Sequence, residues 1–125
     1  MTKNSNCRTA GNKGEEYAAE RLSEDGYTVL CRNYTCRGGE IDIIAEKGSN
    51  ICFIEVKTRS LFSGLDAAEA AGGVKSERVS HAARCFLEEY RENAYVSSLT
   101  PRFDVFEIYT SAGSVRKHNH ITGII

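Results

Sequence analysis

The chain has 125 residues, of which 41% are hydrophobic and 26% are charged, and this size allows one self-supporting core but excludes two ordinary domains. Sixteen basic and 17 acidic residues give a formal net charge of −1, which excludes binding of nucleic acid through overall positive charge. We expect a polar tail at residues 1–10 and a single domain at residues 11–125, with any phosphate contact made by a local basic cluster.

The first residues, Met1 to Asn6, lack the apolar run of a signal peptide, and no stretch of the sequence is apolar enough to cross a membrane. We therefore expect a cytoplasmic protein that does not contact membranes. The cysteines are odd in number and form no C-x-x-C pair, so a structural zinc site is disfavoured. We expect all five cysteines to be reduced thiols, namely Cys7, Cys31, Cys36, Cys52 and Cys85. Cys52 and Cys85 fall at positions predicted to lie in the core.

The first predicted element is a helix from Gly14 to Asp25, which Gly26 ends. Its apolar residues recur at helical spacing together with Glu15, so Glu15 should point inward whereas Glu16 should point outward. Residues 27–32 are β-branched and aromatic, which predicts a strand.

Residues 39–45 and 51–57 alternate with period two around a polar turn, which predicts an antiparallel hairpin. A turn of even length places Asp42 opposite Glu55 and Glu40 opposite Lys57, all on one face. With an odd turn, Asp42 would instead face Ile54 or Val56 unless a bulge restored the phase.

The two faces of this hairpin differ in kind. The reverse face is apolar and should pack against a helix; it carries Ile41, Ile43, Ala45, Cys52, Ile54 and Val56. Two carboxylates about 4 Å apart repel by roughly 4 kcal/mol at an effective dielectric near 20, and Ile44 and Phe53 suggest that the charged face is partly covered. A covered acidic pair favours a bound divalent cation, whereas the alternative is a solvated face with a surface ion pair between Glu40 and Lys57.

The second half of the chain completes the predicted sheet. Residues 60–73 are mixed, with a short helix at 66–71 that would serve as a lid or a dimer contact. A second amphipathic helix follows from Val74 to about Tyr90, with Lys75 on its inward face. Strands at 102–109 and 115–121 then give an α/β fold, a mixed sheet of about five strands flanked by helices.

The chemistry of the charged face suits metal-assisted hydrolysis of a phosphodiester. Asp42, Glu55 and the carbonyl of Val56 would hold Mg²⁺ or Mn²⁺, which prefer oxygen ligands. The ammonium of Lys57 would orient or activate the attacking water, or neutralise the phosphate.

The sequence resembles the YraN-type predicted endonucleases of the PD-(D/E)xK superfamily, near the archaeal Holliday-junction resolvases. The matching residues are Gly11, Gly14-Glu15, Ala18, Arg32-Asn33, Gly39-Glu40-Ile41-Asp42, Phe53-Ile54-Glu55-Val56-Lys57, Arg59, Lys75 and Arg102-Phe103-Asp104. This resemblance implies a restriction-endonuclease-like core with helices on both faces of the sheet. It also implies that Glu15, Asp42 and Glu55 are acidic site residues and that Lys57 is the catalytic lysine, although Ile41 replaces the proline of the superfamily's name.

Other charged residues have weaker assignments. Arg59 and Lys75, and less strongly Arg32 and Arg37, would bind phosphates around the metal; the alternative is ordinary surface charge. Asp104 should be structural and pair with a nearby arginine. His118 and His120 lack a clear third metal ligand and should be surface residues.

Residues 11–125 are thus predicted to be a nuclease-like domain, and we expect an endonuclease that requires Mg²⁺ or Mn²⁺ and acts on DNA, branched DNA included. One alternative is a nucleic-acid-binding module that kept the nuclease fold without useful turnover. Another is a protein-interaction subunit that uses residues 60–73 and has an inert acidic face. A homodimer is compatible with each.

Overall fold

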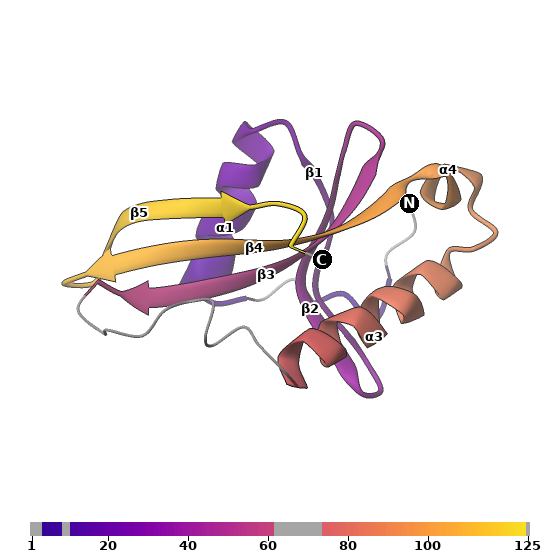
Figure 1. The fold of residues 1–125 in the computed structure, drawn as a ribbon, viewed down its shortest axis with the longest axis horizontal. Helices are drawn as coiled ribbons and strands as arrows, with labels where there is room; N and C mark the ends of the chain where they lie inside the picture. Colours follow the sequence, from indigo (N-terminus) through magenta and orange to yellow (C-terminus); the bar gives the residue numbers. More distant parts are fainter. Residues whose placement is uncertain (1–3, 9–10, 62–73, 125) are drawn as a thin grey trace.

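The computed structural model describes residues 4–8, 11–61 and 74–124, and the side chains of residues 74–76 lie outside this description (Figure 1). The helices are α1 (Lys13–Glu24), α3 (Val74–Glu89) and α4 (Ala94–Ser98). The strands are β1 (Thr28–Cys36), β2 (Gly39–Lys47), β3 (Asn50–Ser60), β4 (Thr100–Ser111) and β5 (Ser114–Ile121). None of the helices in the described residues is both long and apolar enough to cross a membrane.

The strands form one mixed sheet in the order β1-β2-β3-β4-β5. Neighbouring strands are antiparallel except for β3 and β4, which are parallel. Helix α1 packs on one face with Ile43, Cys52 and Ile54, and α3 packs on the other with Ile44 and Phe53. This architecture confirms the predicted α/β fold and is consistent with a restriction-endonuclease-like core.

Helix α1 begins with a capping box, in which Asn12 accepts a hydrogen bond from the Glu15 N–H and Glu15 accepts one from the Asn12 N–H. Its buried residues include Ala18 and Leu22, as the apolar spacing predicted. A Cβ on Gly14 would lie 2.4 Å from Oγ1 of Thr58, so the helix N-terminus packs directly on the end of β3.

Helix α3 covers the opposite face and contacts the β1–β2 hairpin closely. Its buried residues Val79, Ala82, Ala83 and Phe86 follow the predicted periodicity. A Cβ on Gly39 would lie 2.6 Å from the carbonyl oxygen of Arg78, which is too close for any side chain. Only glycine therefore allows this approach of hairpin to helix.

Several element predictions need correction. Strand β1 continues to Cys36, beyond the predicted end at residue 32, and the short helix α4 was not predicted. The predicted helix at 66–71 lies outside the described residues. Ile41, predicted to share the α1 face with Ile43, instead belongs to the core cluster on the α3 side.

The position of Ile41 has a local cause in β1. Arg32 pairs with Ile43 and Tyr34 pairs with Ile41, and Asn33 between them has a left-handed φ of 49°. This irregular residue interrupts the alternation of the pair and turns the hairpin tip toward α3.

The cysteine prediction was wrong for one pair, because Cys7 and Cys31 form a disulfide with their Cα atoms 5.4 Å apart. The N-terminal segment runs beside β1, where the Arg8 N–H donates to the Arg32 carbonyl over 2.8 Å and the Thr35 N–H donates to the Asn6 carbonyl over 3.0 Å. This pairing brings the two cysteines together although they are 24 residues apart.

Asp104 is structural, as predicted. Arg102 donates to both of its carboxylate oxygens, over 2.9 and 2.8 Å. His120 was wrongly predicted to be a surface residue: its side chain is 14% exposed, and its Nε2 lies 2.8 Å from the Asp104 carboxylate. His118 is exposed, as predicted, and its Nδ1 shares a hydrogen bond with the Tyr17 hydroxyl.

Candidate active site at the fork between two strands

The predicted register of the central hairpin is confirmed for residues 43–47 and 50–54, but Glu40 does not lie opposite Lys57, because Glu40 pairs with Thr35 of β1 and Lys57 pairs with Glu107 of β4. Pairing runs from Lys47 with Asn50 to Ile43 with Ile54. The next positions along the two strands are Asp42 and Glu55. The sheet thus brings the two acidic residues to the end of the β2–β3 pairing.

At this point the two strands separate. Strand β2 continues into the hairpin with β1, whereas β3 continues beside β4 (Figure 1). Oδ2 of Asp42 accepts a hydrogen bond of 2.8 Å from the Val56 N–H, so a side chain takes the place of a strand partner. Because the N–H and carbonyl of one strand residue point the same way, the Val56 carbonyl is directed to this opening as well. We call this opening, with Asp42, Glu55, Val56 and Lys57, the fork.

Glu55 and Lys57 lie on one face of β3 and are both buried, with 8% and 7% exposed. The Lys57 Nζ lies 3.7 Å from Oε1 of Glu55. Glu40 pairs instead with Arg78, 3.6 Å away, in a half-exposed contact on α3. Burial of Glu55 and Lys57 contradicts the alternative of a solvated face.

Glu107 is a further buried carboxylate beside the fork, which the sequence analysis missed. It is 7% exposed and pairs in register with Lys57 across the parallel β3–β4 ladder. The signal in the sequence was a single acidic residue in a strand that is otherwise apolar from Val105 to Ile108.

Glu15 is buried as predicted, and it has a structural role in the capping box. Its Oε1, the Arg32 Nη2 and the Asn33 Nδ2 all lie within 3.0 Å of the point that a Cβ on Gly11 would occupy. Asn33 lies in β1 across from Asp42. The first turn of α1 thus meets the sheet next to the fork.

The three predicted carboxylates do not form a compact metal cluster by themselves. Among the described residues, the one set of three ligating side chains whose donor atoms all lie within 4.8 Å of one another is elsewhere, at Cys36, His81 and Cys85. Asp42 and Glu55 occupy the positions that follow the last β2–β3 pair, and Glu15 comes from α1.

The four predicted phosphate-binding residues lie in different places. Arg59 follows Lys57 by two residues on β3, and Arg32 adjoins the first turn of α1. Buried nitrogens of both side chains, Nε in each case, have no hydrogen-bond partner in the described part of the chain. Arg37 lies at the tip of the β1–β2 hairpin, away from the end of β3 (Figure 1). The side chain of Lys75 lies outside the described residues.

The donor set of the fork fits a hard divalent cation. Carboxylate and carbonyl oxygens are the ligands that Mg²⁺ and Mn²⁺ prefer, and one or two carboxylates are usual. An ammonium group beside them would attract an anionic substrate. The fork therefore carries the elements needed for chemistry on a phosphate ester.

Comparison with known proteins places the chain in a family. The profile of the family described as "Uncharacterised protein family UPF0102" matches residues 14–108. A UPF0102 protein of Caldanaerobacter subterraneus subsp. tengcongensis is 36% identical over 118 residues, which cover 93% of each chain. A UPF0102 protein of Caldicellulosiruptor saccharolyticus is 39% identical over 104 residues, or 83% of this chain and 85% of the relative. A UPF0102 protein of Frankia casuarinae is 41% identical over 114 residues, or 90% and 92%.

The matched region includes nearly all of α1, the fork and most of the sheet, and it therefore contains all the residues on which the resemblance rested except Gly11. The chain belongs to the UPF0102 family, the YraN-type group of nuclease-like proteins related to the PD-(D/E)xK superfamily.

Proposed function

We propose that this protein is a metal-dependent endonuclease that hydrolyses phosphodiester bonds of DNA, branched DNA included. The observation that carries the proposal is the fork, where Asp42 accepts a hydrogen bond from the Val56 N–H at the divergence of two strands and the buried Lys57 lies 3.7 Å from the neighbouring Glu55. Membership of a nuclease-like family supports the same conclusion.

Asp42, Glu55 and the Val56 carbonyl would hold Mg²⁺ or Mn²⁺. The bound ion would polarise the scissile phosphate and stabilise the charge that develops in the transition state. The hydrogen bond from the Val56 N–H fixes one oxygen of Asp42 and so orients its carboxylate.

The remaining residues of the site would act on the substrate and the attacking water. Lys57 is buried beside Glu55, where its ammonium can orient the water and contact a phosphate oxygen. Arg59 and Arg32 carry guanidinium groups, which are suited to bidentate contacts with the DNA backbone. Lys75 and Arg37 would add weaker phosphate contacts, and Glu15 would be a third acidic residue beside the metal.

The test is cleavage of single-stranded, duplex, flap and four-way-junction DNA in Mg²⁺ or Mn²⁺. We expect product from the wild-type protein and none above background from Asp42→Asn, Glu55→Gln or Lys57→Ala. Glu16→Gln, on the exposed side of α1, is the matched control and should retain full activity.

Two outcomes would contradict the proposal. A product that forms at an unchanged rate with both Asp42→Asn and Glu55→Gln would come from a contaminating nuclease. Salt-sensitive binding of branched DNA by wild-type protein, without product in either metal, would instead identify a binding module on the nuclease fold.

A further inference from the structure

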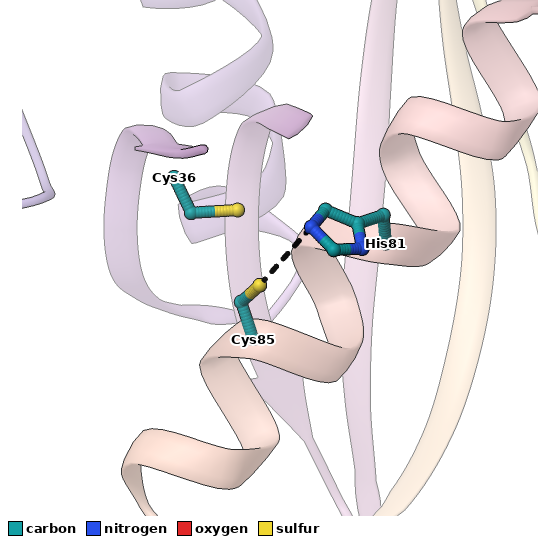
Figure 2. Close-up of side chains that lie close together, drawn as sticks. All are labelled: Cys36, His81 and Cys85. Carbon is teal, nitrogen blue, oxygen red and sulfur yellow. Dashed lines mark hydrogen bonds between the residues drawn. The ribbon is translucent and has the colours of Figure 1, made fainter. Parts of the chain in front are cut away.

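Three soft metal ligands meet on the α3 side of the molecule, outside the fork. Cys36 ends β1, and His81 and Cys85 lie one turn apart on α3 (Figure 2). Their ligand atoms all lie within 4.8 Å of one another. We call these residues the Cys-His cluster.

The spacing in the cluster suits a tetrahedral ion. His81 Nε2 lies 3.6 Å from Cys85 Sγ. Zinc bonds of about 2.3 Å to sulfur and about 2.0 Å to nitrogen, at a tetrahedral angle, separate the two ligand atoms by about 3.5 Å. The two helix residues therefore already stand at the distance that zinc requires.

The backbone around the cluster is held by contacts that do not involve the three ligands. Gly39 packs on α3 so closely that a Cβ would lie 2.6 Å from the Arg78 carbonyl oxygen and 2.9 Å from the Ala82 nitrogen. In the turn before it, a Cβ on Gly38 would lie 3.5 Å from Cδ2 of His81. The hairpin tip and the helix thus present their ligands as one preformed unit.

Charge and protons also balance at the cluster. Two thiolates neutralise Zn²⁺, and binding releases one proton from each thiol. His81 Nε2 lies 2.9 Å from the Arg37 carbonyl oxygen, so metal binding exchanges this hydrogen bond for coordination of a neutral imidazole protonated at Nδ1. Cys36 and Cys85 are half-buried and His81 is exposed, which leaves room for water as a fourth ligand.

We propose that Cys36, His81 and Cys85 bind one Zn²⁺ ion, with water in the fourth position. This site is separate from the fork, because its sulfur and nitrogen ligands select a softer ion than the oxygen ligands of the fork. It would fasten the β1–β2 hairpin, whose second strand carries Asp42, to α3. Sequence analysis disfavoured a zinc site because the chain has no C-x-x-C pair, and the proposed ligands instead come from a hairpin and a helix, with Cys36 and His81 45 residues apart in the chain.

The test is titration of the metal-free protein with Co²⁺, followed by displacement with Zn²⁺. We expect one equivalent to produce the thiolate-to-cobalt charge-transfer band and tetrahedral d–d absorption, and Zn²⁺ to abolish both. Cobalt at the carboxylates of the fork would give no thiolate band, so the readout is independent of nuclease activity.

Variants assign the band to the cluster. Cys36→Ala and Cys85→Ala should each remove it or reduce it strongly, and His81→Ala should weaken cobalt binding. Cys52→Ala and His118→Ala, which lie outside the cluster, are the matched controls and should leave it unchanged.

A second measurement uses only the wild-type protein, in case a variant fails to fold. Zn²⁺ should slow alkylation of Cys36 and Cys85 by iodoacetamide, and mass spectrometry would locate the protected residues. Absence of a thiolate band in protein with three titratable thiols would overturn the proposal. So would a band that persists in Cys36→Ala and Cys85→Ala, or alkylation of both cysteines at the same rate with and without Zn²⁺.

Discussion

Two buried acidic centres lie on opposite faces of the same sheet, and they differ in the groups that surround their carboxylates. Asp104, on the α1 face, accepts hydrogen bonds from Arg102 and from the Gly123 N–H. It also shares a hydrogen bond with His120 Nε2. At the fork, Lys57 lies 3.7 Å from Glu55 and pairs in register with Glu107, and Asp42 accepts a hydrogen bond from the Val56 N–H. The first centre gathers donors around one carboxylate, and the second gathers carboxylates around one ammonium.

We infer that this difference separates a structural acid from the acidic residues of the proposed active site. Burial of the Asp104 carboxyl opposes ionisation, but the hydrogen bonds from His120, Arg102 and the Gly123 N–H outweigh it and hold the pKa below its usual value. Such a carboxylate stabilises the fold and requires no bound cation to balance its charge. The fork buries Glu55 and Glu107 beside Lys57, and a buried acidic site of this kind favours a bound cation.

The largest expected effect is on activity at the fork. Glu55→Gln should lower metal-dependent DNA cleavage by at least about 100-fold, the scale on which loss of one stabilising group lowers kcat. It should also lower the free energy of unfolding, because it removes the charged partner of the buried Lys57. Parallel measurement of cleavage per folded molecule and of urea unfolding separates the two effects. A variant that cleaved at the wild-type rate per folded molecule would make Glu55 structural, like Asp104.

Asp104→Asn should lower stability without lowering cleavage. Loss of the carboxylate leaves Arg102 with a neutral partner and should lower the free energy of unfolding by about 2–3 kcal/mol, less than for a fully buried pair because the Arg102 side chain is 23% exposed. Urea denaturation measures this loss. Cleavage per folded molecule should stay near the wild-type rate, and a large loss there would place Asp104 in the site.

The pH dependence of stability sharpens the comparison further. Because the pKa of Asp104 is lower in the folded than in the unfolded protein, its contribution is complete above about pH 4 and is lost as pH falls through the folded value. Thermal unfolding of wild-type protein and Asp104→Asn from pH 7 to pH 2 measures this. The two curves should converge at the acid end, and a constant difference would assign the stabilisation to packing.

The smallest effect is expected at Glu40, which lies two residues before Asp42. Its contact with Arg78 is half-exposed on both sides, so Glu40→Gln should change the free energy of unfolding by less than about 1 kcal/mol. Cleavage should also be nearly unchanged. If this variant lost activity as Glu55→Gln does, the fork would extend along β2 and include a third carboxylate.

Local patterns were enough to predict the hairpin that carries the fork. Strict alternation in both strands and an even turn fix the pairing of residues 43–47 with 50–54, and the apolar spacing of α1 buries Glu15. Each of these features depends on residues that are close in the sequence, so few alternatives compete with it.

Long-range pairing accounts for what the sequence did not show. Glu107 reaches Lys57 through parallel strands that no local pattern aligns, and His120 reaches Asp104 across β4 and β5. The Cys7–Cys31 disulfide and the Cys-His cluster likewise join segments far apart in the chain. The displacement of Ile41 depends on the single left-handed residue Asn33.

The parallel ladder between β3 and β4 has a consequence for how the chain folds. It runs from Asn50 with Thr100 to Ser60 with Thr110, so each pair must close a loop of 50 residues. Such closure is slow, whereas the β2–β3 hairpin closes within a few residues. In pulse-labelled hydrogen exchange during refolding, the amide of Ile43 should become protected before that of Phe106. The two carboxylates would then meet early, and docking of β4 would set the folding rate.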